Sequence, residues 1–124
     1  MLALTVPNEA YRRSLFDARV QGGDTAALVQ LCLEHVITGL GGALFANVRG
    51  DAAGRSKALT RALTAITALE MGVDRTAPLA QALLQIYGSA RQAVLSSVTD
   101  FQPDVLASVR QDFVDIEAAL RSPG

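Results

Sequence analysis

The chain has 124 residues, of which 50% are hydrophobic and 19% charged, and its net charge is −1. These values exclude a disordered chain and suit one domain with a substantial core. Because there is no basic block and only 5% of the residues are aromatic, the composition also argues against a nucleic-acid-binding protein.

The first predicted element is a short helix over residues 9–19. Asn8 is its candidate N-cap, and the helical spacing places Tyr11 and Leu15 on one face. The glycine pair at 22–23 then interrupts the pattern. We expect this pair to act as a hinge, so that the short helix docks on the rest of the domain or swings away from it.

Four longer helices follow, and each begins with a recognisable start signal. They are expected over about 26–49 with Asp24 or Thr25 as cap, about 52–71 with Asp51 as cap, from the Thr76 cap with Pro78 in the first turn to about Val98, and 103–121 starting at Pro103. Four long helices joined by short loops pack most simply as an antiparallel bundle. The sequence therefore predicts one all-α domain, an antiparallel four-helix bundle with a short N-terminal cap helix.

Three of these helices carry a clear apolar face. The residues expected to point inward are Val29, Leu33, Val36, Ile37, Leu40, Leu44 and Val48 in the first long helix, Leu59, Ala62, Leu63, Ile66 and Leu69 in the second, and Val105, Val109, Phe113, Ile116 and Leu120 in the fourth.

The third long helix has more apolar surface than one small core uses. One stripe contains Leu79, Leu83, Ile86, Ala90 and Val94, and a second contains Leu84, Tyr87, Leu95 and Val98. Together the stripes cover about half of the helix circumference. The surplus is either extra packing or a surface for a partner. Arg91 lies within the second stripe, which indicates that the stripe reaches solvent there or that Arg91 awaits a carboxylate or carbonyl from a partner.

Small residues form an arc beside the core face of the first long helix. The arc contains Leu28, Cys32, Gly39, Ala43 and Ala46. A glycine inside a helix costs about 1 kcal/mol relative to alanine, so packing must compensate for it. Two interpretations remain open: close packing against a neighbouring helix of the bundle, or the floor of a groove that receives an amphipathic helix from a partner.

Few residues suggest a catalytic, phosphotransfer or metal-binding site. His35 is the only histidine, and a histidine on a helical bundle raises the possibility of a phosphotransfer domain. Histidine phosphotransfer domains have a Lys before the Gly that follows the His, and Thr38 stands there before Gly39. The lone Cys32 excludes an internal disulfide and fits a reducing compartment. We expect no metal site, no cofactor and no enzymatic activity.

No apolar run approaches the roughly 20 residues of a membrane span, and the N-terminus lacks the features of a signal peptide. We therefore expect a cytoplasmic protein that does not insert into membranes.

The pattern resembles the flagellin-specific export chaperone family, FliS. Family members begin with a short Tyr-containing segment, which corresponds to Ala10-Tyr11-Arg12. A helix of the pattern L-V-x-L-L-Y-D-G-A-I-x-x-L follows, which corresponds to residues 28–40. A pattern like S-L-D…I-A-x-N-L-x-x-L-Y corresponds to Ala68-Leu69-Glu70 and residues 79–87. Departures from the family pattern, at Leu33-Glu34-His35, Ala82 and Ser89, concern contact residues rather than the fold.

The resemblance implies a chaperone without cofactor or catalysis. It implies binding of the disordered C-terminal segment of flagellin in the cytoplasm, so that polymerisation is prevented and export remains possible, with the flagellar export gate as a further partner. The partner-binding residues that we expect are Tyr11 and Leu15 in the hinged segment, Leu28, Cys32, Gly39 and Ala43 on the small-residue arc, and Leu84, Tyr87, Arg91 and Leu95 on the second stripe. The alternatives are a phosphotransfer domain using His35 and a helical module that associates with itself.

Overall fold

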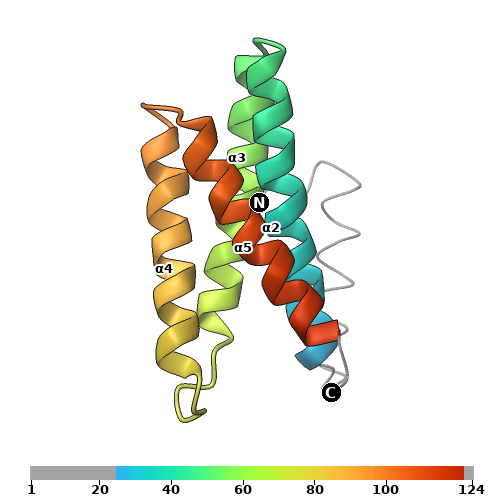
Figure 1. Ribbon diagram of the computed structural model, residues 1–124, viewed down its shortest axis with the longest axis vertical. Coiled ribbons are helices and arrows are strands. Elements are labelled where there is room, and N and C mark those ends of the chain that lie inside the picture. Colours follow the sequence, from blue (N-terminus) through green and yellow to red (C-terminus); the bar gives the residue numbers. More distant parts are fainter. Residues whose placement is uncertain (1–24, 122–124) are drawn as a thin grey trace, which may run out of the picture.

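The computed structural model describes residues 25–121, which form four helices with no strand in this part of the chain. The helices are α2 (Thr25–Val48), α3 (Ala52–Met71), α4 (Ala80–Ser97) and α5 (Pro103–Arg121). Successive helices run in opposite directions (Figure 1). The predicted all-α fold is thus confirmed. The predicted short helix over 9–19, with Tyr11 and Leu15, lies outside the described residues.

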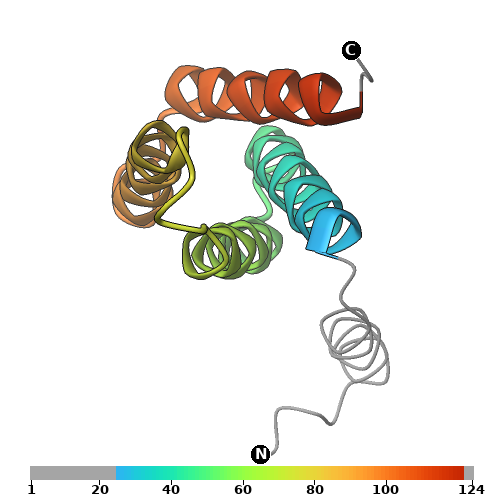
Figure 2. The same ribbon diagram turned by 90° about the horizontal axis from the view of Figure 1, so that it is seen from below.

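The helices surround one core, but they do not pack equally tightly. α2 and α3 share the most extensive interface, whereas α4 and α5 touch each other least. Seen end-on, α5 lies on one side of the bundle and spans from α4 to α2 (Figure 2). It runs diagonally, from the end of α4 toward the beginning of α2 (Figure 1). This diagonal path explains the sparse packing between α4 and α5, because the two axes diverge along their length.

The α2–α3 connection follows the predicted capping signals. Gly50 has φ 70°, and the hydrogen bonds that close α2 run from the Gly50 N–H to the Asn47 carbonyl at 3.1 Å and from the Asp51 N–H to the Ala46 carbonyl at 2.9 Å. This is a Schellman ending, in which glycine tolerates the positive φ. The Asp51 side chain then accepts a hydrogen bond from the Gly54 N–H at 2.9 Å. Asp51 is therefore the N-cap of α3, as predicted.

The predicted start of α4 is wrong by about one turn. Thr76 does not cap the helix, because its own N–H and hydroxyl donate to the Asp74 carboxylate at 3.0 and 2.6 Å. The Ala77 N–H then bonds to the Asp74 carbonyl at 2.9 Å, which adds a further turn. Pro78 consequently lies before the helix, which begins at Ala80. An aspartate side chain that binds the backbone two residues onward competes with helix initiation.

The interior confirms most of the predicted core. Its largest fully buried side chains are Phe113, Leu33, Leu40, Ile66, Leu106, Val36 and Val94. The prediction that Val48 points inward is wrong, since this residue is 85% exposed. The ends of α2 and α3 that meet at Gly50 project past the α4–α5 loop (Figure 1). No neighbour within the described chain is therefore in place to cover Val48.

The predicted apolar face of α5 is only partly correct. Phe113 is buried, but Val105 and Leu120 are exposed, and Val109 and Ile116 are half-buried. Leu106, which was not predicted, is completely buried. The face is therefore rotated from the predicted one, because α5 packs more closely on α2 than on α4. Much of its valine-rich side remains uncovered.

α2 also corrects the expectation that no segment is long and apolar enough for a membrane span. By length and composition α2 passes that test, with a mean hydropathy of 1.5 over its best window. Core helices of bundles pass the same test. Seven of the 24 residues of α2 are buried in the bundle, including Leu33, Val36 and Leu40, so α2 contributes to the core, and 33% of its apolar window is buried.

Candidate functional site

The small-residue arc of α2 is already covered by α3. A Cβ atom added to Gly39 would lie 2.9 Å from the Ala62 nitrogen and 3.0 Å from the Ala58 oxygen, both backbone atoms of α3. Cys32 and Ala43 are buried, and Leu28 is half-buried. The prediction that this arc is the open floor of a groove is therefore wrong. The other interpretation, close packing between helices of the bundle, is what the structure shows.

Gly41 makes room for α5 instead. The Arg110 Nε atom lies 3.2 Å from the Cβ position of Gly41 and donates to the Ile37 carbonyl oxygen at 3.3 Å. An arginine from α5 thus reaches the backbone of α2 where α2 lacks a side chain. The glycines of α2 consequently serve the contacts with both neighbouring helices.

The second stripe of α4 divides into a buried part and an exposed part. Tyr87 is only 3% exposed, and its ring centroid lies 6.0 Å from that of Phe113. The expectation that Tyr87 forms part of an open surface is wrong, because the ring fills the centre of the bundle. Leu84 is half-buried, whereas Leu95 is 42% exposed and Val98 is also exposed. Only the C-terminal part of this stripe is thus accessible.

Arg91 already has a carboxylate partner within the chain. Its Nε atom lies 3.0 and 3.3 Å from the two carboxylate oxygens of Glu70 on α3. The prediction that Arg91 awaits an acceptor from another protein is wrong in this respect. The acceptor was visible in the sequence, since Glu70 is the acidic residue of the Ala68-Leu69-Glu70 motif.

Burial disfavours ionisation of two side chains in the core, Cys32 and Tyr87. Burial raises the pKa of the Cys32 thiol to about 11, so the reactive thiolate is not formed near neutral pH. Burial, and then the nearby Cys32, also raise the pKa of Tyr87. His35 is half-buried on α2. Among residues 25–121, no three His, Cys, Asp or Glu side chains are grouped closely enough to hold a metal ion.

An open groove lies instead between α4 and α5. Two hollows share Ser89 and follow one another along these helices. The larger, of about 540 Å³, is lined by Ser89, Gln92, Ala93, Ser96, Ser97, Asp100, Gln102 and Val105. The smaller, of about 300 Å³, is lined by Gln85, Ile86, Ser89, Ala90, Val109, Asp112 and Phe113. We call these two hollows together the α4–α5 groove.

The lining of the groove combines apolar side chains with polar ones. Apolar lining comes from Ile86, Ala90, Ala93, Val105, Val109 and Phe113. Serine, glutamine and aspartate side chains form the rest. Such a groove suits an amphipathic helix. Its apolar side chains would pack on the apolar lining residues, while its backbone satisfies its own hydrogen bonds.

Sequence reasoning did not find the groove on this flank of α4. The valines of α5 were assigned to the core, which left no reason to expect a groove beside them. One signal was available, since Ser89, Ala93 and Ser97 recur every four residues and form a line of small side chains. A line of small residues facing the valines of α5 leaves space between the helices.

Comparison with protein families places this geometry in context. Residues 7–121 match the family model described as flagellar protein FliS. No curated protein matches the chain. The family match spans nearly the whole sequence, includes all four described helices, and agrees with the helical bundle seen here. The chain therefore belongs to the FliS family, the flagellin-specific export chaperones.

Proposed function

We propose that this protein is a cytoplasmic chaperone that binds the disordered C-terminal segment of flagellin, prevents its premature polymerisation and keeps it competent for export. Family membership supports the role in flagellar export. The observation that carries the specific proposal is the open α4–α5 groove, whose lining offers apolar side chains together with polar ones. Flagellin is the partner and the export gate is a further proposed partner.

The proposed mechanism is coupled folding and binding. A disordered segment becomes helical as its apolar side chains replace water in the groove. Each 100 Å² of apolar surface removed from water contributes roughly 2.5 kcal/mol before costs. Ordering the segment and restricting its motion offset much of this gain. Binding by burial alone, without a covalent step, allows the cargo to be released at the export apparatus.

Two carboxylates that line the groove suggest the charge of the bound segment. Asp100 and Asp112 both line the hollows, and neither forms an ion pair among residues 25–121. A basic side chain of the cargo would complement these carboxylates. We therefore expect the affinity for flagellin to fall as the salt concentration rises.

The residues that the sequence predicted as partner-binding have different roles in this proposal. Leu95 extends the accessible surface on the other flank of α4, beside the Arg91–Glu70 ion pair. Leu28, Cys32, Gly39, Ala43, Leu84 and Tyr87 support the bundle from within or at its edge. We propose that the hinged segment with Tyr11 and Leu15 covers the binding surface as a lid when no cargo is bound. Hydrogen exchange of residues 9–19 should then be slower without cargo than with cargo, and equal protection would refute the lid.

The decisive experiment fills the groove without disturbing the core. Ser89 is exposed and lines both hollows, so Ser89→Trp should occupy the space that the cargo needs. Ser108→Trp is the matched control, since Ser108 is an exposed serine of α5 that lines neither hollow. Calorimetry with a flagellin C-terminal peptide should show at least about tenfold weaker binding for Ser89→Trp alone.

Different results would refute the groove as the binding site and flagellin as the partner. Equal affinity of both variants and the unmodified protein would exclude the α4–α5 groove as the binding site. If the unmodified protein fails to bind the peptide at all, the flagellin proposal itself is refuted.

A further inference from the structure

The end of the bundle where α2 meets α3 carries an exposed apolar and basic surface. Phe45 is 64% exposed, and Val48 beside it is more exposed still. Arg49, which follows α2, lies against Phe45, and α3 adds two exposed cations, Lys57 and Arg61. We call these five residues the basic shoulder. Phe45, Val48 and Arg49 lie at the C-terminal end of α2, and Lys57 and Arg61 follow in the first half of α3.

The three cations of the basic shoulder have no carboxylate partner in residues 25–121. The ion pairs there are those of Arg91 and Arg121. Between residues 45 and 64 the sole acidic residue is Asp51, and its carboxylate already accepts the Gly54 N–H. The positive charge of the basic shoulder is therefore not neutralised locally.

The neighbouring Arg55, unlike the cations of the basic shoulder, is held by contacts within the bundle. Arg55 donates to the Asn47 side chain at 2.8 Å, and its guanidinium lies 5.1 Å from the ring centroid of Phe101. Arg55 thus fastens α3 to the end of α2 and to the α4–α5 loop. Arg49, by comparison, lies 5.5 Å from the ring centroid of the exposed Phe45, so that both remain on the surface.

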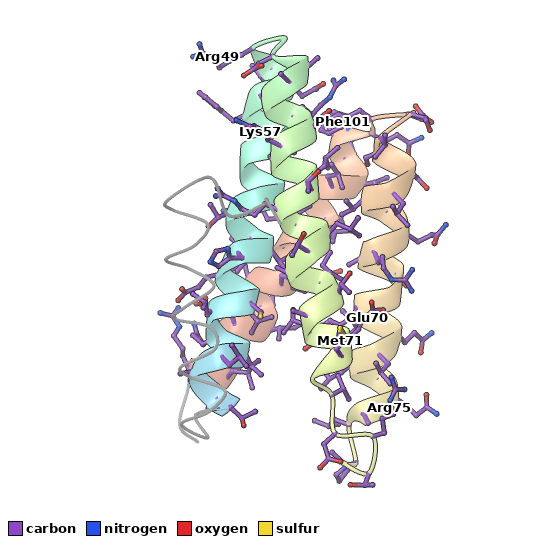
Figure 3. The ribbon with its side chains drawn as sticks, turned by 180° about the vertical axis from the view of Figure 1, so that it is seen from behind. Arg49, Lys57, Glu70, Met71, Arg75 and Phe101 are labelled. Atoms are coloured by element: carbon purple, nitrogen blue, oxygen red, sulfur yellow. The ribbon has the colours of Figure 1, made fainter. Side chains whose placement is uncertain are left out.

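The three cations are related by the helical repeat of α3 and by the antiparallel course of α2 and α3. Lys57 and Arg61 are four residues apart, so they follow one another along one face of α3. Arg49 and Lys57 lie at the same end of the molecule on adjoining helices (Figure 3). An exposed apolar pair at a bundle end that also carries exposed cations is complementary to a helix with an apolar anchor flanked by carboxylates.

We propose that the basic shoulder docks an acidic, amphipathic segment of a second protein. Carboxylates of that segment pair with Arg49, Lys57 and Arg61, and an apolar side chain covers Phe45 and Val48. A protein segment is favoured over an anionic membrane because polybasic membrane contacts use clusters of about 4–8 Lys or Arg. The net charge of −1 also makes this basic surface a local exception within the chain.

The basic shoulder is independent of the α4–α5 groove. It is built from α2, α3 and the residue that follows α2, and shares no residue with the groove lining. One molecule can therefore hold cargo in the groove and an acidic partner at the basic shoulder at the same time. Failure of the flagellin proposal leaves this inference standing, and the reverse also holds.

The test uses a defined probe, because the partner is identified here by its chemistry. The probe is a fluorescein-labelled synthetic helix with Leu and Phe on one face and Glu on the other. Its control is the same helix with Gln in place of Glu. Fluorescence anisotropy is measured at low and high salt with the full chain, the double variant Lys57→Glu/Arg61→Glu, and the charge control Arg75→Glu. Arg75 is an exposed cation near the opposite end of α3 (Figure 3).

We expect the Glu probe to bind in a salt-sensitive manner and the Gln probe to bind more weakly. The double variant should bind the Glu probe roughly tenfold more weakly, because two attractive charge pairs become repulsive. Arg75→Glu should bind like the unmodified chain, and circular dichroism should show both variants folded.

Three results would overturn the proposal. The first is equal binding of the Glu and Gln probes, or equal losses in the double variant and Arg75→Glu. The second is retention on phosphatidylserine vesicles without binding of the Glu probe, which would assign the surface to membranes. The third is sedimentation that shows a dimer dissociated by the double variant, which would assign the surface to a second copy of the chain.

Discussion

Replacing Gly39 by alanine should destabilise the bundle, although alanine is the better helix former. Gly39 lies where the backbones of α2 and α3 approach most closely, and the new Cβ atom would lie 2.9 Å from the Ala62 nitrogen and 3.1 Å from its Cα atom. These neighbours are backbone atoms, so they cannot move aside by rotating a side chain. One helix must shift away from the other.

The size of the effect follows from two opposing contributions. Alanine in a helix interior is favoured over glycine by roughly 1 kcal/mol. Overpacking a tight contact costs typically about 1–3 kcal/mol, and the upper part of that range applies because backbone must move. We therefore expect the free energy of unfolding to fall by about 1–2 kcal/mol.

Gly42→Ala is the matched comparison. Its added Cβ atom would meet the Ala58 Cβ atom at 3.4 Å, which is close to an ordinary contact. The helix preference then dominates, and this variant should be as stable as the unmodified protein or up to about 1 kcal/mol more stable. Urea unfolding followed by far-UV circular dichroism measures both variants. A Gly39→Ala variant at least as stable as Gly42→Ala would refute the close-packing argument.

Three further predictions concern the core and its edge. Tyr87→Glu should lose most of its helicity in far-UV circular dichroism, because burying a carboxylate beside Phe113 costs more than about 3 kcal/mol; a folded variant would contradict the placement of Tyr87. The Cys32 thiol ionises near pH 9.0 when unfolded and near 11 when folded, so its contribution is complete below pH 9 and lost by about pH 11. Denaturant unfolding between these pH values should therefore show a loss of which about 2–3 kcal/mol comes from the thiol, so Cys32→Ala should reduce the loss by that amount and leave the part due to Tyr87; an unchanged loss would exclude the thiol. A double-mutant cycle between Arg91 and Glu70 should give less than about 1 kcal/mol, since the Arg91 side chain is 41% exposed; a coupling above about 2 kcal/mol would indicate a stronger role.

The four long helices and most of their ends were predictable because they depend on local chemistry. Asp51 caps α3 through its own side chain, Gly50 adopts the positive φ that ends α2, and Pro103 begins α5. These signals act within a few residues. The start of α4 was missed for the same kind of reason, because the turn at Asp74 competes locally with the Thr76 cap.

The family resemblance also rested on the sequence alone. Hydrophobic spacing and motif order over most of the chain indicated the FliS family, and the family match over residues 7–121 confirms it. Short motifs of this kind identify relatives because they preserve the order of helices. They do not specify which side chains remain accessible on the finished bundle.

Accessibility was decided by the tertiary structure. Tyr87 and Leu95 belong to the same stripe of α4, yet the first is buried and the second is 42% exposed. Gly39 could have lined an open groove or a helix contact, and only the position of α3 settled which. Helical periodicity defines the width of an apolar face, but it does not define the angle at which a neighbouring helix crosses that face. The diagonal course of α5, which depends on contacts between residues far apart in the chain, leaves the α4–α5 groove open.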